Sequence, residues 1–371
     1  MKFVVITHVA HGKSNTGYFA YAPYVREMNV WLQFATDVVV VAPLDSREKS
    51  EIEMPYAANV VLQKIPGFNF KTALSVVGAI WKIPIICFTI FKTMAAADHI
   101  HLRCPGNIGL LGCIIQIFFP RKQKTAKYAG NWDPSAIQPW SYRLQKWILS
   151  NRFLTRNMKV LVYGNWPEST SNIKPFFTAT YRETDKSTVF PRDPAGVIRF
   201  VFVGTLAEGK RPLYAVGLIE ALQNRGTACT LELFGEGSQR FVLEQYITSK
   251  NLMNSIVLRG NQSESIVRKA YKDAHFLVLP SKSEGWPKAV AEAMFWGCIP
   301  VVTPVSCVPF MLGDAARGIL LGMDIDKDSA EIAALIENPG EYRDKAEQCM
   351  AWSRQYTLDL FENEIKALLT R

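Results

Sequence analysis

The sequence predicts an α/β protein built from two doubly wound domains, in which helices cover both faces of a parallel sheet. Its 371 residues exceed the size that one hydrophobic core usually serves, so two domains of about 150–200 residues are expected. Short apolar runs alternate with longer amphipathic stretches, and this alternation starts again in the second half. Hydrophobic residues make up 49% of the chain and charged residues 20%, which is typical of a compact globular protein rather than a disordered one.

The first half of the chain alternates between expected strands and helices. Apolar runs of strand length indicate buried strands of a parallel sheet at Phe3–Thr7, Val38–Ala42, Val60–Leu62, Ile100–Leu102, Thr125–Tyr128 and Val160–Val162. Stretches of helical length and spacing lie between them, at Tyr24–Phe34, Thr72–Ala97, Gly106–Phe118 and Pro139–Leu154.

The second half repeats this order. The expected strands are Ile198–Val203, Thr230–Phe234, Ile256–Leu258, Phe276–Leu279, Pro300–Val302 and Gly318–Leu321. The expected helices are Leu213–Leu222, Gln239–Thr248, Ser263–Lys272, Lys288–Phe295 and Asp328–Ile336, and the last stretch, Tyr342–Leu369, is also expected to be helical.

A segment between the halves, Thr184–Gly196, carries two prolines, two aspartates and little apolar periodicity, which favours a linker. We therefore expect an N-terminal domain over residues 1–190 and a C-terminal domain over 191–351. The last helix, from about 352 to 371, is expected to pack back on the first domain.

Charge is divided unevenly between the halves. Residues 1–192 carry a net charge of +12, and the remainder carries −3. The N-terminal half is therefore expected to meet an anionic partner, such as anionic lipid, a phosphate-bearing acceptor or nucleic acid. Ordinary solubilising lysine is the alternative, and nucleic-acid binding is not expected, because no groove-reading motif accompanies the charge.

Neither the cysteines nor the apolar stretches indicate an exported or membrane-spanning chain. Seven cysteines are scattered singly without C-x-x-C, which fits a reducing cytoplasm better than a disulfide framework. The N-terminus reads as a first strand rather than a signal peptide. The apolar stretch Ala73–Ala97 is interrupted by charge and proline, and Ile108–Pro120 is shorter than the roughly 20 residues of a spanning helix. We expect a cytoplasmic protein that contacts the inner face of a membrane peripherally.

The segment from Pro280 to Val302 carries the most informative motif. A buried strand ends at Pro280, a polar loop follows, and a helix begins near Pro287. Free amides and the positive end of the helix dipole can hold a phosphate or a sugar hydroxyl there. Glu284 lies in the loop and Glu292 inside the helix, and each carboxylate can accept two hydroxyl protons from a ribose diol or a sugar. The alternative is a helix cap.

This motif resembles the donor-site signature of retaining glycosyltransferases with the GT-B fold, most closely their family 4. Glu-x7-Glu stands between P-S and E-A-M-x-x-G-x-P-V-V, and the similarity covers about Phe200 to Leu321. The resemblance implies that Glu292 holds the ribose hydroxyls. It implies that Glu284 and the backbone after it hold the donor sugar and the distal phosphate, which makes Gly285, Trp286 and Lys288 donor-binding candidates.

A second loop, after the strand Ile198–Val203, offers cations for a diphosphate. Gly204 lets the backbone turn close to a ligand, and Lys210 and Arg211 could stabilise the charge of a leaving group without a metal. The family usually reads G-R-L-x-x-x-K here, so Lys210 matches its lysine while Thr205 replaces its arginine. Arg211 could substitute for that arginine. The alternative is a solvated pair of cations at the start of a helix.

Other loops match the family in part. Gly235, in F-G-E-G-S, resembles a G-x-G turn, and Gly260 follows the next strand at the level where the family pairs backbone with the nucleobase. Gly12 stands where the family has a Gly-Gly turn. A-D-H-I-H-L-R-C-P resembles a D-x-x-H-x-H strand end in which Arg103 replaces the second histidine and could touch sugar or phosphate. The acceptor-side candidates, chosen by position only, are Tyr24, Arg26, Glu27, Asn131, Trp132 and Asp133.

The sequence thus predicts a metal-independent, retaining glycosyltransferase that moves a sugar from a nucleoside-diphosphate sugar to a carbohydrate or lipid-linked acceptor. Glu284, Lys210 and Arg103 are its catalytic candidates, and neither a cofactor nor a metal is expected. A role in cell-surface polysaccharide or lipopolysaccharide assembly would follow. The alternative is a non-catalytic nucleotide-sugar-binding or partner subunit of the same fold, which Thr205 favours. A nicotinamide oxidoreductase is disfavoured, because neither half shows G-x-G-x-x-G after its first strand.

Overall fold

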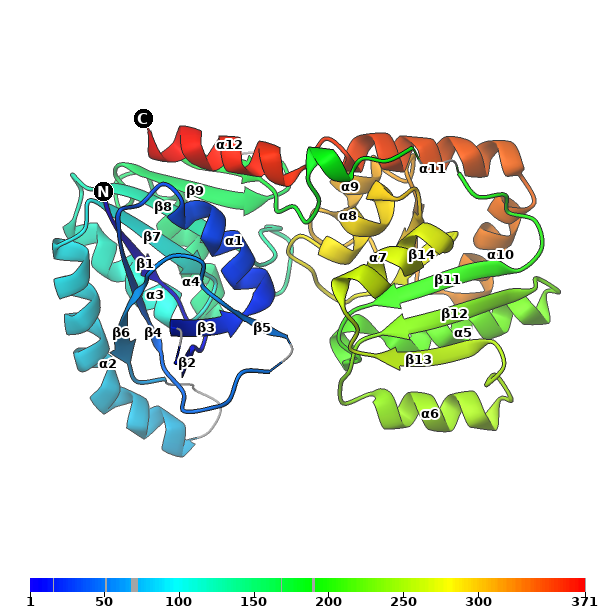
Figure 1. The fold of residues 1–371 in the computed structure, drawn as a ribbon, viewed down its shortest axis with the longest axis horizontal. Helices are drawn as coiled ribbons and strands as arrows, with labels where there is room; N and C mark the ends of the chain where they lie inside the picture. Colours follow the sequence, from blue (N-terminus) through cyan, green and yellow to red (C-terminus); the bar gives the residue numbers. More distant parts are fainter. Residues whose placement is uncertain (16, 51, 68–72, 168, 189–190, 371) are drawn as a thin grey trace. The chain divides into compact units, whose positions relative to one another are not determined.

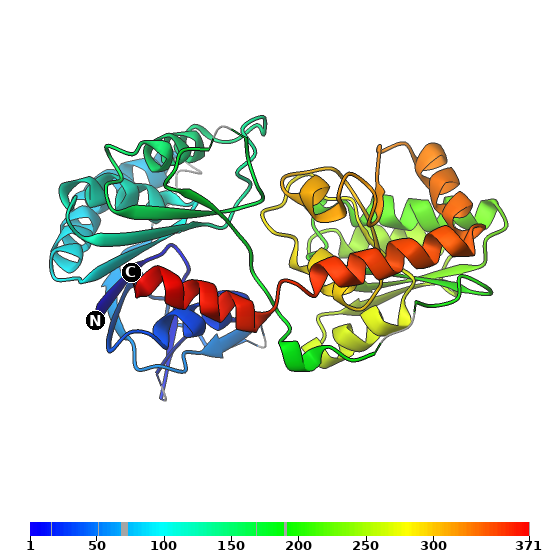
Figure 2. The ribbon, with the colours of Figure 1, turned by 90° about the horizontal axis from the view of Figure 1, so that it is seen from above.

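A computed structural model describes residues 1–15, 17–50, 52–67, 73–167, 169–188 and 191–370, with side chains in the second helix from residue 81 onward. The chain forms two compact units. Unit 1 is Met1–Phe177 with Glu362–Arg371, and unit 2 is Thr178–Phe361. In Figures 1 and 2 each unit is a parallel sheet with helices on both faces. The predicted α/β fold with two doubly wound sheets is confirmed.

Unit 1 contains a seven-stranded parallel sheet in the order β10-β9-β8-β7-β1-β4-β6. Its strand order reverses between β1 and β7, which is where doubly wound sheets bind ligands at the carboxyl ends of their strands. The strands are β1 Lys2–Ile6, β4 Asp37–Pro43, β6 Val61–Ile65, β7 His99–Cys104, β8 Gln123–Tyr128, β9 Met158–Tyr163 and β10 Ile173–Phe176.

Helices cover the two faces of this sheet differently. One face packs against α2 (Ala73–Ala95), α3 (Asn107–Ile115) and α4 (Trp140–Ser150), and forms a large apolar core. The 3-10 helix η1 (Gln116–Phe118) continues α3. The other face packs against α1 (Ala22–Leu32), and Trp31 of this helix stacks on Phe3 of β1.

Period-two alternation in β7 and β8 makes the face under α1 polar. His99, His101 and Arg103 point to it from β7, and all three side chains are buried. Thr125 of β8 bonds both histidine rings, at 2.9 Å to His99 Nε2 and 2.8 Å to His101 Nδ1. The neighbouring Lys127 is also fully buried. Some of the basic charge of the N-terminal half therefore lies inside unit 1.

A small antiparallel sheet replaces the loop that the sequence predicts after the first strand. It consists of β2 (Gly12–Ser14), β3 (Gly17–Tyr21) and β5 (Glu53–Pro55), in the order β2-β3-β5. A Cβ at Gly12 would lie 2.1 Å from the Phe19 ring, so close packing in this hairpin requires a glycine there.

Unit 2 contains a six-stranded parallel sheet in the order β13-β12-β11-β14-β15-β16, which reverses between β11 and β14. Its strands are β11 Ile198–Val203, β12 Cys229–Phe234, β13 Ile256–Gly260, β14 Phe276–Leu279, β15 Ile299–Val302 and β16 Ile319–Leu320.

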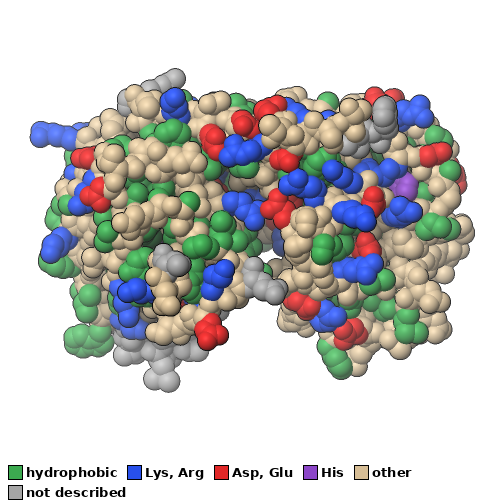
Figure 3. Space-filling model, in the orientation of Figure 1, with side chains coloured by type: hydrophobic (Ala, Val, Ile, Leu, Met, Phe, Trp, Pro, Cys, Tyr) green, Lys and Arg blue, Asp and Glu red, His purple; other side chains and the backbone are tan. Residues whose placement is uncertain are grey.

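The helices of unit 2 also form two layers. The first consists of α5 (Pro212–Asn224), α6 (Arg240–Ser249) and α10 (Ile325–Ile336). The second consists of α7 (Glu264–Asp273), α8 (Lys288–Phe295) and α11 (Pro339–Ser353). A short helix, α9 (Val308–Leu312), follows β15, and the 3-10 helices η2 (Glu183–Asp185) and η3 (Glu208–Lys210) lie in loops. Figure 3 shows basic and acidic side chains interspersed on the visible face of this unit.

The last stretch, predicted as helical over Tyr342–Leu369, is helical except for a break at residues 354–357. The chain forms two helices, α11 and α12 (Leu358–Leu369), because Thr357 starts the second one: its hydroxyl accepts the Leu360 amide at 3.4 Å. The segment Thr184–Gly196, predicted as a linker, lies within unit 2. Arg192 anchors it there by donating to four backbone carbonyl groups.

Two further features bear on the expected compartment. All seven cysteines are free thiols, and six are buried while Cys87 on α2 is half-buried. Within the described residues, no helix has both the length and the apolar character needed to cross a bilayer.

Candidate functional site

Four loops of unit 2 meet at the carboxyl edge of its sheet. The Gly204 amide donates to Phe234 O at 2.9 Å, and the Gly235 amide donates to Gly260 O at 2.8 Å. A Cβ at Gly235 would lie 2.0 Å from Gly204 O, so this close approach of two loops requires glycine. Three of the five glycines predicted as donor-binding thus lie together at the carboxyl ends of β11, β12 and β13. The loop after β14 joins them, since Lys282 N donates to Gly209 O at 2.8 Å.

An ion pair joins the loops that flank the reversal of strand order. Lys210, after β11, donates from Nζ to Glu284 Oε1, after β14, at 2.5 Å. The Glu284 side chain is 9% exposed and that of Lys210 is 30% exposed. Cys307 and Ser306 fix the backbone beside Glu284, because both donate to Gly285 O. The two predicted catalytic residues of unit 2 are therefore in contact, and the cation remains open to solvent.

Glu292 lies one step further along, on α8, and is held by two hydroxyl groups. Its Oε1 accepts from Thr180 Oγ1 at 2.7 Å, and its Oε2 accepts from the Tyr271 hydroxyl at 3.3 Å. Burial, and then the charge of Glu292, raises the pKa of Tyr271, so that hydroxyl stays protonated and donates. A carboxylate that accepts hydrogen bonds from two hydroxyl groups has the pattern that a ribose diol requires.

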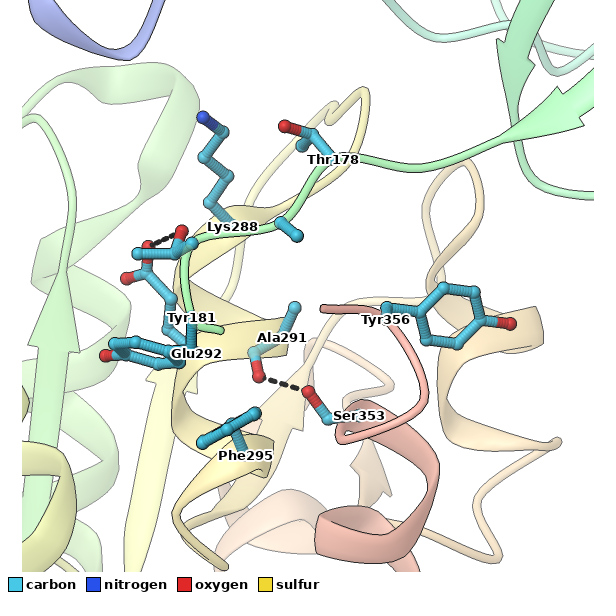
Figure 4. A pocket seen from close by; sticks show the side chains of 10 residues that line it. Thr178, Tyr181, Lys288, Ala291, Glu292, Phe295, Ser353 and Tyr356 are labelled. Carbon is cyan, nitrogen blue, oxygen red and sulfur yellow. Dashed lines mark hydrogen bonds between the residues drawn. The ribbon is translucent and has the colours of Figure 1, made fainter. Parts of the chain in front are cut away.

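The pocket around Glu292 is small in this structure. Its volume is about 10 Å³, the space of a single water molecule. Figure 4 shows Glu292 at one side, the extended side chain of Lys288 at the rim, and Ser353 donating to Ala291 O at the base. A ribose at Glu292 would need more space than this pocket offers, although each carboxylate oxygen has a second lone pair with which to accept a hydrogen bond.

The remaining residues predicted to bind the donor differ in how far their side chains are exposed to solvent. Trp286 is buried against Trp352 and Tyr356, with ring centroids 6.1 and 5.5 Å away, so it contributes packing and its backbone. Arg211 adopts a left-handed backbone (φ 49°) before α5, and its guanidinium points to Pro280 O at 3.5 Å. Thr205, at the position of the family's arginine, is exposed.

Unit 1 has a separate hollow of about 440 Å³ at the carboxyl edge of its own sheet. A Cβ at Gly106 would lie 2.7 Å from His8 Nδ1, so the imidazole of His8 lies directly on the start of α3. The lining comprises His8, Ala10, Pro43, Asp45, Gly67, Gly106, Asn107, Ile108 and Tyr142. Sequence reasoning missed this set as a site. The signal was positional: His8, Asp45 and Gly106 follow β1, β4 and β7, next to the reversal of strand order.

Arg103, predicted as catalytic, forms a buried ion pair with Glu27 of α1. Its guanidinium carbon lies 5.4 Å from the centroid of the Tyr24 ring. Burial raises the pKa of the Tyr24 hydroxyl above its ordinary value. The structure therefore places Arg103, Glu27 and Tyr24 in the interior of unit 1, while Arg26 is exposed.

The other acceptor-side candidates form a turn after β8. Asn131 Oδ1 accepts the Asp133 amide at 2.9 Å, and Asp133 Oδ1 accepts the Ser135 amide at 2.8 Å. Trp132 is 4% exposed and packs edge-on against Tyr128 in the core. Its burial is explained by packing. None of the six predicted acceptor residues, all of which the structure describes, lines the hollow of unit 1.

No group of three His, Cys, Asp or Glu side chains suited to a metal ion occurs within the part of the chain that the structure describes.

Residues 186–351 match the family model "Glycosyl transferases group 1". The match lies within unit 2 and includes Lys210, Glu284 and Glu292, while all of unit 1 lies outside it. No curated protein sequence matches the chain.

Solved structures share the fold at low sequence identity. HepE from Anabaena, in complex with UDP and glucose, is 15% identical with a TM-score of 0.69, over 100% of this chain and 99% of that one. Sucrose-phosphate synthase from Thermosynechococcus elongatus is 14% identical with a TM-score of 0.67, over 99% and 98%. TarM from S. aureus is 16% identical with a TM-score of 0.57, and the match covers 78% of this chain but 59% of TarM. These likenesses support the GT-B fold.

Proposed function

We propose that the chain is a glycosyltransferase that moves a sugar from a nucleoside-diphosphate sugar to a saccharide or lipid-linked acceptor. The Lys210–Glu284 ion pair carries the proposal. It lies at the reversal of strand order in unit 2, inside the stretch that matches the glycosyltransferase family model.

Each member of the pair has a role once the donor binds. The diphosphate oxygens replace Glu284 as the partner of Lys210, and the ammonium stabilises the negative charge that grows as the bond from the sugar to the diphosphate breaks. Glu284, released from Lys210, accepts hydrogen bonds from hydroxyl groups of the donor sugar. The acceptor hydroxyl forms the new glycosidic bond, and its proton leaves with the nucleoside diphosphate or solvent.

Glu292 holds the ribose in this proposal, and Arg211 provides the second cation near the diphosphate. We propose a retaining reaction that needs no metal, since Lys210 and Arg211 supply positive charge where other enzymes place a divalent ion. The hollow of unit 1, lined by His8, Asp45 and Tyr142, is the proposed site of the acceptor.

A lipid-linked acceptor would place the protein at the inner face of a membrane, in polysaccharide or lipopolysaccharide assembly. The basic character of residues 1–192 supports this assignment. The second candidate is a non-catalytic nucleotide-sugar-binding subunit. The exposed Thr205 favours this second candidate, because the chain lacks, at that position, the arginine that the family places on the diphosphate.

Thermal shift against UDP-, GDP- and ADP-sugars tests donor binding. UDP-glucose is the first probe, because the HepE structure contains UDP and glucose. One donor should raise the Tm of the full chain, and Lys210→Ala should remove that rise while Glu347→Gln, an exposed carboxylate on α11, should keep it. Release of nucleoside diphosphate then separates the two candidates, since a pure binder releases none. Absence of any shift across the panel would contradict both.

A further inference from the structure

Exposed aromatic rings and cations gather at the amino end of the sheet in unit 1. Phe88 and Phe91 of α2, Phe118 of η1 and Phe153 after α4 are 69%, 45%, 68% and 72% exposed. Four exposed cations accompany them: Lys92, Arg121, Arg152 and Arg156. We call these eight residues the aromatic–basic face.

Direct contacts join the three segments of this face. The Phe91 and Phe118 rings lie 6.3 Å apart between centroids. Asn157 Nδ2 donates to Pro120 O at 3.0 Å, which links the turn after α4 to the turn after η1. Lys122 Nζ donates to Ala95 O at 2.9 Å, which links that same turn to the end of α2. The face is therefore one continuous surface where β8 and β9 begin.

The outer stripe of α2 extends the apolar part of the face along the helix. Trp81 and Ile85, at 79% and 61% exposed, precede Phe88 at helical spacing. Lys82 is exposed on the same helix. Figure 3 shows hydrophobic and basic side chains along the edge of unit 1 where Figure 1 places α2. A stripe of large exposed apolar residues is unusual on a protein surface without a partner.

The charge around the face has one sign. Between Trp81 and Asn157 the sequence has eleven Lys and Arg but two acidic residues, Asp98 and Asp133. Three of those cations, Arg103, Lys124 and Lys127, are buried, so the others set the charge of the surface. A second copy of the chain would bring like charge onto like charge, which disfavours self-association through this face.

We infer that the aromatic–basic face docks the protein on an anionic lipid bilayer. Aromatic rings enter the interfacial layer while lysine and arginine bind lipid phosphates, and the combination of exposed rings with one sign of charge fits that partner. The inference goes beyond the proposed function, because the face lies at the amino end of the sheet and the proposed acceptor hollow at its carboxyl edge. The docking itself does not require transfer.

Co-sedimentation of the full chain with vesicles tests this inference. The chain should bind vesicles that contain phosphatidylglycerol, bind pure phosphatidylcholine at least 10-fold more weakly, and lose affinity as salt rises. Phe88→Ser with Phe118→Ser and Phe153→Ser should weaken binding at least 10-fold. Arg121→Glu with Arg152→Glu should remove the preference for anionic lipid.

Matched changes on unit 2 serve as controls. Phe241→Ser, at a ring that is 67% exposed on α6, and Lys269→Glu, at an exposed cation on α7, should leave vesicle binding unchanged. Circular dichroism and the donor-induced Tm shift report whether each variant is folded and whether unit 2 functions. The inference is overturned if the wild-type chain does not bind anionic vesicles, or if it binds poly-uridine but no vesicles. Undiminished vesicle binding by the folded triple-Phe variant also overturns it. Failure of donor binding alone would instead contradict the proposed function.

Discussion

The two units share a parallel, doubly wound sheet but place their charged side chains differently. In unit 2 the charged side chains of the candidate donor site lie in loops that follow the strands, and there Lys210 forms an ion pair with Glu284. In unit 1, charged and titratable groups lie on one face of the sheet itself, under α1. Lys127 shows this most clearly, since its Nζ donates to Phe177 O at 2.8 Å and lies 4.4 Å from the centroids of Tyr163 and Phe176. A charge in a loop is available to a ligand, whereas a charge on a covered face is part of the fold.

The largest expected effect tests whether the Arg103–Glu27 pair is part of the fold. Glu27→Gln should lower the free energy of unfolding by about 3–5 kcal/mol, because it leaves the Arg103 charge buried without a counter-charge. Urea unfolding at neutral pH measures the loss. Arg143→Gln, at an exposed cation on α4, should change stability by less than about 0.5 kcal/mol. A small change in the free energy of unfolding on Glu27→Gln would instead indicate that Arg103 is available to a ligand.

The loop charges of unit 2 should respond in the opposite way. Glu284→Gln should lower the rate of sugar transfer about 100-fold or more while changing stability little, because the carboxylate acts on the donor rather than on packing. The assay is release of nucleoside diphosphate, with Tm as the check on folding. Normal turnover by this variant would invalidate the site.

Acid should destabilise unit 1 before unit 2. Burial lowers the pKa of His11 to about 4 and that of His99 to about 4, so both stay neutral in the folded protein. The unfolded chain takes up these protons as the pH falls below about 6.5, and the folded chain does so only near 4. Stability is therefore complete above about 6.5 and falls by up to about 3 kcal/mol per histidine between those values.

Hydrogen exchange from pH 7 to pH 5 can follow this loss strand by strand. Amides of β1 and β7 should lose protection earlier than those of β11 and β14. His99→Asn should flatten the pH dependence of unfolding in unit 1, and an unchanged pH dependence in that variant would show that His99 does not control it.

The smallest expected effect concerns Thr205. Thr205→Arg restores the cation that the family places on the diphosphate, at an exposed position that can accept a long side chain. The affinity for the nucleoside diphosphate should rise about 3- to 10-fold, measured by calorimetry, which corresponds to about 1 kcal/mol. Thr227→Arg, outside the donor loops, is the control. Unchanged affinity would mean that Arg211 already fills this role.

The sheets were predictable because their strands are apolar and regularly spaced. β11 over Ile198–Val203 and β14 over Phe276–Leu279 have the predicted bounds. The hairpin β2–β3 was missed, since strands of three and five residues that contain glycine carry little periodicity. The break between α11 and α12 depends on one capping threonine within a helical pattern.

The candidate site was predictable in its residues but not in its contacts. Short motifs identified Lys210, Glu284 and Glu292, because loop and helix signals locate them after particular strands. Thr180 is 112 residues from Glu292 in sequence, and no local pattern reveals their hydrogen bond. The burial of Arg103 and Trp132 also depends on helices that only the fold brings over them.

The thiols have a practical consequence. Cys87 is half-buried on α2 beside Phe88, and the other six are buried, so a thiol-directed fluorophore should attach there first in the native protein. Burial raises the pKa of the Cys87 thiol, so labelling should be slow at neutral pH and faster at mildly alkaline pH. The natural sequence thus provides an optical probe at the aromatic–basic face without any substitution.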